Sequence, residues 1–389
     1  MIKRIPQIEV LRVLAMAGVF FFHIWSVVPE AGTQNPLGPL FGDILAQGYL
    51  GVVVFNAISG FVLTLPLAAR GGALNLTAGQ FFRRRFGRIC PQYYMALILW
   101  SAAGLVTVSA SAPPLWRAFF EHALFVHTLD PACFYAIVPA LWWMGLLAQF
   151  YLFYPLLLRL FVRLGPGRAF GAVVAGCFGV WGLLEFLAVR FPDGPFGLVA
   201  YMVYFNLPAR LPEFAMGMFL AFWWTGRHSA PAHVQALAGP VGLRRCLALT
   251  GAAIVAVALT VAFKEGLPMP VAHFLVCVSS LLVCAAVFSL PHAARIGESR
   301  LVIRLGAASY SFYLIHQPLL GYGAEMLKGR LQPLAIFGVL AVAVGALALA
   351  GAFVMDRIAG AVWSLGSGNR PGAGPETKKA AKPGSAASD

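Results

Sequence analysis

The stretch PLAIFGVLAVAVGALALAGAFVM fills residues 333–355 and contains no charged residue. A helix of about 20 apolar residues is long enough to cross the hydrocarbon core of a bilayer. The composition of the 389-residue chain agrees, because 60% of its residues are hydrophobic and only 11% are charged. A soluble domain carries about 25% charged residues. The chain has too little charge to cover a soluble globule, so we expect an integral membrane protein.

Nine further stretches are long and apolar enough to be read as spans, and none alternates in the manner of a β-barrel strand. The sequence therefore predicts an all-α fold, a polytopic membrane helical bundle of about ten transmembrane helices. In the sixth span, Pro208 and Pro212 predict an irregular start and helix only after Pro212. The semi-polar stretch 114–138 is too short to span and is expected at the interface. The predicted spans are 10–28, 44–66, 91–109, 139–160, 169–189, 203–225, 246–263, 270–290, 305–324 and 333–355.

The basic residues indicate the orientation of these spans. With a cytoplasmic N-terminus, 22 Lys and Arg residues fall on inner segments and five on outer ones. Cytoplasmic loops carry such an excess, so both termini are predicted to be cytoplasmic. We expect a membrane domain over 1–365 and a disordered cytoplasmic tail over 366–389, which is rich in Gly, Pro, Ala and Lys.

The net charge of +14 follows from these inner loops and requires no nucleic acid partner. The six cysteines form no CxxC pair and no cluster with metal-ligand spacing, so no metal is expected. The chain also lacks a G-x-S-x-G elbow, an H-E-x-x-H motif, a P-loop and a Rossmann glycine pattern. A conventional hydrolase, a metalloenzyme and a nucleotide-driven motor are therefore disfavoured.

Ionisable residues inside predicted spans are costly and are functional candidates. In the first span, Arg12 and His23 are eleven residues apart, which places them on one helix face about 16 Å apart along the axis. A packed histidine, with Arg12 reaching lipid phosphates, explains this span equally well.

A cluster of four arginines precedes the third span. Arg85 and Arg88 are one helical turn apart, and guanidinium groups bind phosphate through paired hydrogen bonds. Pro91 directly after them is suited to a helix start. Anchoring to anionic lipid is the competing explanation.

Two later spans also carry polar groups. In the sixth span, Arg210 and Glu213 are three residues apart and can neutralise each other, in a structural or a functional pair. In the ninth, Tyr310, Tyr313 and His316 predict a polar cavity, with His316 about 15 Å from the cytoplasmic edge. Glu185 receives no assignment, and His127 is interpreted as structural.

Five blocks, in order along the chain, resemble the membrane acyltransferase-3 family of bacteria. Each lies at a topological position that suits the family. The blocks are Glu9-x-x-Arg12 with His23; the glycine-rich 48–61 ending Ser59-Gly60-Phe61; 82–93 with Arg85-x-x-Arg88; 142–155; and Ser309-Tyr310-x-x-Tyr313-Leu-x-His316-x-Pro318. Many family members carry a glutamate at the position where this chain has Leu147. This glutamate is absent here and can take no part in the chemistry of this chain.

The resemblance implies a multi-pass enzyme of the inner (plasma) membrane that moves an acyl group, usually acetyl, from cytoplasmic acetyl-CoA to a sugar hydroxyl of an envelope glycan or glycolipid. We expect donor and acceptor at opposite faces of one cavity lined by Arg12, His23, Tyr313 and His316. The expected catalytic residues are His23, Arg12, His316 and Glu213; the donor-binding residues Arg84, Arg85, Arg88 and Tyr93; and the acceptor-binding residues Ser59, Trp142, Arg210, Tyr310 and Tyr313.

Alternatives from other classes remain open. A transporter or flippase of lipid-linked sugars also needs a helical bundle, a polar cavity and an arginine patch, but it cleaves no thioester. A non-catalytic scaffold is the third possibility. The blocks of the other large class of membrane-bound O-acyltransferases are not found.

Overall fold

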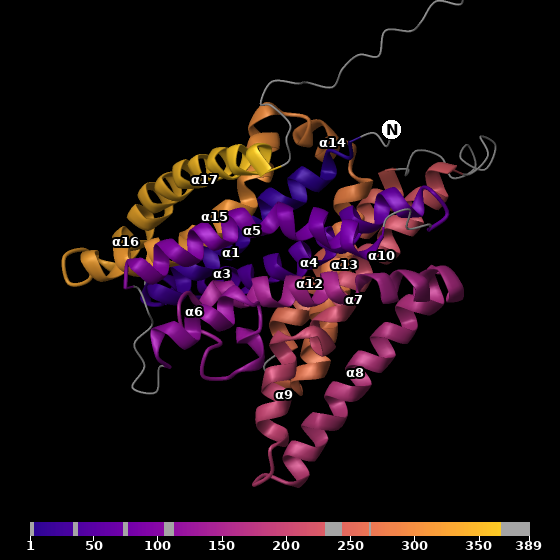
Figure 1. Cartoon of the computed structure of the whole chain (residues 1–389), viewed down its shortest axis with the longest axis horizontal. Coiled ribbons are helices and arrows are strands. Elements are labelled where there is room, and N and C mark those ends of the chain that lie inside the picture. Colours follow the sequence, from indigo (N-terminus) through magenta and orange to yellow (C-terminus); the bar gives the residue numbers. More distant parts are fainter. Residues whose placement is uncertain are drawn as a thin grey trace, which may run out of the picture.

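The computed structural model describes residues 4–33, 38–72, 77–104, 113–229, 243–263 and 266–366. Within these ranges all regular secondary structure is helical, which confirms the all-α prediction (Figure 1). Helix α17 runs through Gly366, and the rest of the predicted tail lies outside the described residues.

A long helix stands at each of the ten predicted spans. Six helical segments are long and apolar enough to cross a membrane: Gln7–Val27, Pro39–Ala68, Pro139–Leu164, Pro166–Arg190, Met269–Ser289 and Pro333–Val362. The count of ten spans and the side of the termini stay predictions. The long helices are α1 (Gln7–Val27), α4 (Leu50–Ala68), α5 (Ala78–Ala102), α7 (Trp142–Leu164), α8 (Pro166–Arg190), α10 (Leu207–Ser229), α12 (Leu243–Phe263), α13 (Met269–Ser289), α15 (Arg300–Leu327) and α17 (Gly345–Gly366).

Shorter helices connect or extend the long ones. The stretch 114–138 holds only short pieces, none of which could span. These elements are α2 (Glu30–Thr33), α3 (Pro39–Ala46), η1 (Gln47–Tyr49), α6 (Leu115–Ala123), η2 (His127–Leu129), η3 (Pro139–Leu141), α9 (Phe196–Phe205), α14 (Pro291–Gly297), α16 (Pro333–Val339) and the π-helical η5 (Leu340–Val344).

The prediction that a helix starts at Pro91 is wrong, because α5 already begins at Ala78 and contains Pro91. Thr77 starts this helix with a capping box. Its side chain accepts a hydrogen bond from the Gln80 backbone N–H, and the Gln80 side chain accepts one from the Thr77 N–H. All four arginines of the cluster therefore lie on a helix rather than before one.

The prediction of an irregular start before Pro212 is also wrong. Helix α10 begins at Leu207 and includes both prolines. Pro208 lies in the first turn, where a missing N–H leaves no helical hydrogen bond unmade. The break lies earlier, at the extended residue Asn206. Gln149 bridges it by donating to Asn206 Oδ1 at 2.6 Å and accepting from the Leu207 N–H at 3.0 Å.

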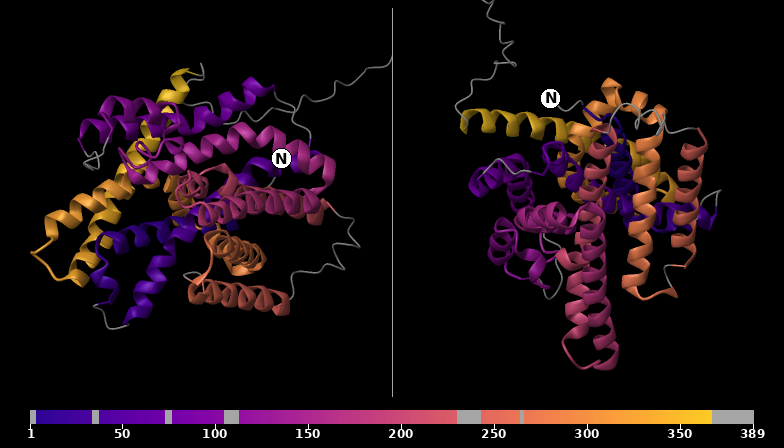
Figure 2. Two further views of the ribbon diagram at one scale, coloured as in Figure 1. Left: turned by 90° about the horizontal axis from the view of Figure 1, so that it is seen from below. Right: turned by 90° about the vertical axis from the view of Figure 1, so that its right-hand side faces the viewer.

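Helix α1 lies inside the bundle, where it packs against α4 and α15 (Figure 1). On its other side α4 packs against α10 almost backbone to backbone. A Cβ at Gly60 or Gly217 would collide with the backbone of the opposite helix, so only glycine permits this approach. Helices α8 and α9 form a pair that projects from the rest, as both Figure 1 and Figure 2 show.

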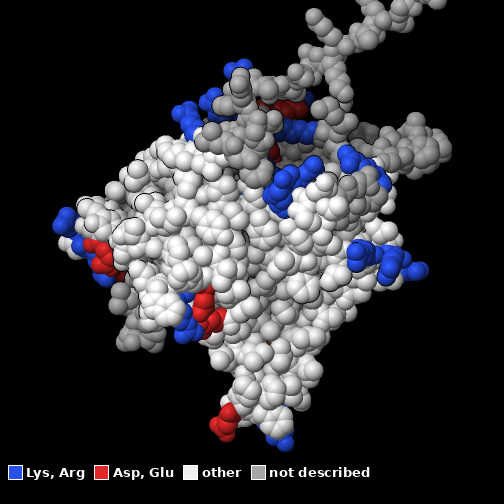
Figure 3. All heavy atoms as spheres, viewed as in Figure 1, with Lys and Arg blue, Asp and Glu red and all other residues white. Residues whose placement is uncertain are grey.

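The space-filling view shows how charge is distributed over one face. Most basic side chains gather along the upper and right edges, and a few charges lie at the lower and left edges (Figure 3). A broad surface between them is almost free of charge. A bilayer core covers a surface of this kind, because charge is costly there.

Candidate active site

The candidate site consists of two cavities that lie one after the other along α1, α4, α7 and α15. We call them the inner and the outer cavity; their volumes are about 270 Å³ and 560 Å³. Helix α1 lines the inner cavity with Arg12 and the outer one with His23, and α4 does so with Phe55 and Val52. Tyr313 on α15 lines both. The cavities are therefore stacked along the bundle, with Tyr313 at their junction.

The inner cavity is basic. Arg12, Arg85 and Arg88 line it together with one carboxylate, Asp356, which accepts a hydrogen bond from Ser311. Arg85 and Arg88 come from one turn of α5, as their spacing predicts, whereas Arg12 comes from α1. Three guanidinium groups thus line one hollow, and groups of this kind can bind phosphate through paired hydrogen bonds.

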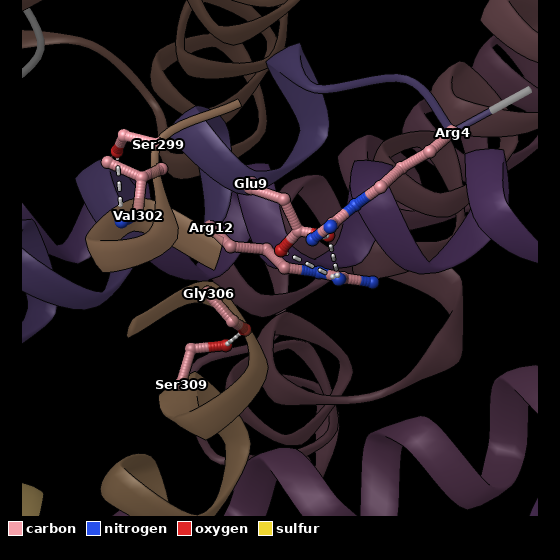
Figure 4. A network of polar contacts seen from close by, with 7 residues as sticks. All are labelled: Arg4, Glu9, Arg12, Ser299, Val302, Gly306 and Ser309. Carbon is pink, nitrogen blue, oxygen red and sulfur yellow. Dashed lines mark hydrogen bonds and ion pairs between the residues drawn. The ribbon is translucent and has the colours of Figure 1, made fainter. Parts of the chain in front are cut away.

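Glu9 positions Arg12 at the rim of this cavity. Its two carboxylate oxygens each lie 3.2 Å from one Arg12 guanidinium nitrogen, and Arg4 approaches Glu9 at 3.1 Å (Figure 4). Across from them, Gly306 on α15 leaves room for the Glu9 side chain. A Cβ at position 306 would collide with the Glu9 carboxylate. Glu9 binds Arg12 through a single terminal nitrogen, so the rest of the guanidinium is left for the cavity.

The outer cavity contains a paired histidine. Nδ1 of His23 lies 2.8 Å from Nε2 of His316. Nδ1 of His316 faces the backbone oxygens of Tyr313 at 2.9 Å and Phe312 at 3.2 Å. Carbonyl oxygens only accept hydrogen bonds, so His316 Nδ1 carries a proton. In the neutral ring, Nε2 of His316 then has a lone pair and accepts a hydrogen bond from His23 Nδ1.

The direction of this hydrogen bond decides which atom of His23 is basic. Since His23 Nδ1 is the donor, the lone pair of the neutral ring lies on Nε2. His23 lines the outer cavity, whereas His316 is 1% exposed and lies behind it. A second histidine thus fixes the tautomer of His23, and a ring nitrogen held in this way can act as a general base.

The wall of the outer cavity also includes one strongly held cation. The Arg210 guanidinium lies 4.2 Å from the ring centre of Tyr204 and 5.5 Å from that of Trp142. It donates to Glu213 at 2.9 Å, and both side chains are buried. Glu213 neutralises Arg210 without reaching the cavity.

Two residues that the sequence analysis missed complete this ion pair. His273 Nε2 lies 2.8 Å from Glu213, and Asn56 donates to Glu213 at 2.5 Å. Asn56 also accepts from Trp143 Nε1 at 2.7 Å, so the network ends at a wall of the inner cavity. Cys277 is near enough to Glu213 and His273 for a metal site, but Arg210 already engages this carboxylate. The only sequence signal was that buried polar groups need partners.

The single cavity that we expected is corrected to two. Arg12 and His23 share a helix but line different cavities, and the rings of Phe55 and Trp143 pack against Tyr313 where the two cavities adjoin. Of the other predicted residues, Ser59 and Tyr310 line the inner cavity, and Trp142 the outer one. Arg84, Tyr93, Glu213 and His316 line neither. Tyr93 is fully buried and donates to the His122 carbonyl at 2.8 Å, which is a structural contact.

Outside the cavities, His127 stacks on His122 with ring centres 3.8 Å apart. Burial lowers the pKa of His122 to about 4 and that of His127 well below its ordinary value. Both rings are therefore neutral at pH 7, as suits a structural pair. Glu185 accepts a hydrogen bond from Trp181 Nε1 at 3.2 Å.

Comparison with known proteins gives a single family. The family model described as "Acyltransferase domain" matches residues 5–357. Acyltransferase MdmB of Streptomyces mycarofaciens is 27% identical over 85% of this chain and 82% of its own length. Peptidoglycan O-acetyltransferase OatA of Listeria monocytogenes is 22% identical over 84% of this chain. The match covers only 51% of the length of OatA. No solved structure matches the chain.

Proposed function

Since the chain belongs to the Acyltransferase domain family, we propose that it is a membrane O-acyltransferase that moves an acetyl group from acetyl-CoA to a hydroxyl of an envelope carbohydrate. The observation that carries this proposal is the His23–His316 pair, which leaves the lone pair on Nε2 of His23, a residue that lines the outer cavity. The relatives named O-acetyltransferase or acyltransferase support the reaction class.

The inner cavity is the proposed donor site. Coenzyme A carries several phosphate charges, and Arg12, Arg85 and Arg88 surround one hollow. Charge-assisted contacts of this kind fix the position of a phosphate. Arg12 is thus reassigned from catalysis to donor binding, because it and His23 line different cavities.

The outer cavity is the proposed acceptor site. Tyr49, Tyr135, Trp142 and Tyr204 line it, and such rings combine an apolar face with a polar edge. A sugar has the matching surface of C–H faces and hydroxyl edges. The printed name of OatA, a peptidoglycan O-acetyltransferase, agrees with a carbohydrate acceptor.

The histidine pair provides a route for the proton. His23 Nε2 takes the hydroxyl proton as the acceptor oxygen attacks the thioester carbonyl, and it returns this proton to the departing thiolate. His316 accepts from His23 Nδ1 throughout, so it stabilises the imidazolium that forms between the two steps. Sidedness follows from the stacking of the cavities: the donor enters the inner one, the acceptor enters the outer one, and the acyl group passes Tyr313.

The experiment that tests this function uses membrane vesicles from cells that produce the protein, supplied with labelled acetyl-CoA. We expect alkali-labile acetyl ester on envelope glycans, detected by mass spectrometry, with the wild type and not with His23→Gln. Stacked cavities also suit a flippase of lipid-linked sugars, which is the second candidate. Movement of lipid-linked sugar without release of free CoA thiol by the purified protein would favour the flippase and reject the transferase.

A further inference from the structure

Three aromatic rings meet where the two cavities adjoin. Phe55, Trp143 and Tyr313 line the inner cavity, and Tyr313 also lines the outer one. The ring of Trp143 lies 5.1 Å from that of Tyr313 and 5.8 Å from that of Phe55, and the rings of Phe55 and Tyr313 are 6.5 Å apart. These distances are those of packed aromatic side chains. We call this group the ring barrier.

The ring barrier lies directly beside the histidine pair. The rings of Tyr313 and His316 are 5.7 Å apart, and His316 is bonded to His23. An acyl group that approaches from the inner cavity must pass the barrier before it reaches His23. The barrier is therefore the last part of the protein that the acyl chain meets before transfer.

Two of the three rings are fixed by hydrogen bonds. Tyr313 Oη donates to the Ala140 carbonyl at 2.7 Å, and Trp143 Nε1 donates to Asn56 at 2.7 Å. Asn56 is itself held by Glu213. A rotation of Trp143 would leave two buried polar groups without partners, which is costly in a low-dielectric interior. Phe55 has no polar atom, so packing alone holds it.

We propose that Trp143 is a specificity-determining residue that limits the length of the acyl group passing from donor to acceptor. Since hydrogen bonds hold Trp143 and Tyr313 in place, their rings give way little to a passing group, and the path past them admits acetyl better than longer chains. The inference rests on the proposed function. In the reaction, the acyl C–S bond breaks, a C–O bond to the acceptor forms, and the hydroxyl proton passes to the thiolate.

The size of the effect follows from how well pockets discriminate chain length. One methylene in an apolar pocket changes the rate ratio of two substrates by about 10- to 200-fold. Butyryl exceeds acetyl by two methylenes. We therefore expect the wild type to prefer acetyl-CoA over butyryl-CoA by at least about tenfold.

The test is a competition between the two donors. Membrane vesicles with the envelope acceptors in place receive equal concentrations of acetyl-CoA and butyryl-CoA. Acetate and butyrate are then released from the envelope fraction by mild alkali and measured by mass spectrometry. The ratio of the two products is independent of how much protein is folded.

The variants are Trp143→Ala, which removes the ring, Trp143→Leu, which retains apolar volume, and Trp143→Phe, which keeps a ring but loses the tether to Asn56. The matched control is Trp100→Phe. Trp100 is likewise buried and donates from Nε1, to the Leu314 carbonyl at 3.1 Å, but lines neither cavity.

We expect the acetyl-to-butyryl ratio to fall about tenfold or more in Trp143→Ala and Trp143→Leu, and less in Trp143→Phe, while Trp100→Phe keeps the wild-type ratio. If Trp143→Ala yields no folded protein by size-exclusion chromatography, the two other variants decide. An unchanged ratio in the folded Trp143 variants, or a wild type that uses both donors equally, overturns the inference. A wild type that esterifies no acceptor with either donor rejects the proposed function instead.

Discussion

The two cavities differ in chemistry although α1, α4, α7 and α15 line both of them. The inner cavity is the smaller and is surrounded by Arg12, Arg85 and Arg88. Among the described residues that line the outer cavity, Arg210 alone is a Lys, Arg, Asp or Glu, and Glu213 neutralises it. Aromatic rings and His23 form much of the remaining wall. In the proposed enzyme, recognition of charge and acid–base chemistry are thus separated along the bundle. Changes in the outer cavity should therefore lower kcat, and changes in the inner one should raise KM for the donor.

The largest effect is expected at the base. His23→Ala should lower kcat by about 10²- to 10⁴-fold, because a positioned general base contributes that much to the rate. KM for acetyl-CoA should change little, since His23 does not line the inner cavity. The measurement is steady-state transfer in vesicles, with insertion checked by size-exclusion chromatography. Near-normal product from this variant would make His23 a packing residue.

The arginines of the inner cavity should produce the opposite pattern. A charge-assisted hydrogen bond contributes about 1.5–3 kcal/mol, so Arg85→Ala or Arg88→Ala should raise KM for acetyl-CoA roughly 10- to 150-fold. Lysine should restore only part of this loss, because it has no paired donors. Arg84→Ala is the matched control, since Arg84 is exposed and lines neither cavity. Equal acetyl-CoA binding by the wild type and the Arg85/Arg88 double variant would leave only lipid anchoring.

His316 should affect the rate through His23. Its Nε2 accepts from His23 Nδ1, so His316→Phe removes one hydrogen bond to the imidazolium. A hydrogen bond to a charged group contributes about 1.5–3 kcal/mol. Its loss should therefore lower kcat roughly 10- to 150-fold, with little change in KM for the donor. The dependence of kcat on pH should also move, because the base loses its partner. A lower kcat with an unchanged pH profile would give His316 a packing role only.

The smallest effect concerns the stability of the fold around α6, which carries His122. The folded pKa of His122, about 4, lies below its unfolded value of about 6.5, so the unfolded chain binds more protons between these values. Stability should therefore fall as pH drops from about 6.5 toward 4, by at most about 1.4 kcal/mol per pH unit from this residue. Thermal unfolding of the detergent-solubilised protein at pH 7.5 and 5.0 measures it. His122→Gln should show a shallower dependence on pH, and an identical slope would contradict the assignment.

The sequence predicts the separate parts of this architecture better than their arrangement. Apolar stretches predicted the long helices, because burial in lipid demands them, and the spacing of Arg85 and Arg88 predicted their common cavity. Helical periodicity placed Arg12 and His23 on one face but could not show that they line different cavities, with Phe55 and Trp143 packed against Tyr313 where these adjoin. That division depends on side chains from three other helices.

The helix starts and the buried network show the same limit. Thr77 and Gln80 form a capping box, and α5 begins there, well before Pro91. Asn56 and His273 were missed because each stands alone in an apolar stretch, and only the close packing of α4, α10 and α13 brings them to Glu213. Partners of a buried charge are set by tertiary contacts rather than by local spacing.

In the proposed mechanism, donor and acceptor meet inside the protein from opposite sides. The most direct measurement uses sealed vesicles of known orientation, with acetyl-CoA supplied only on the side of Arg85 and Arg88 and a glycan acceptor only on the other. We expect acetyl ester on the glycan in this arrangement, loss of it in His23→Ala, and none when acetyl-CoA is supplied only on the opposite side. Transfer that occurs only when donor and acceptor share the Arg85 side would rule out passage of the acyl group between the two cavities.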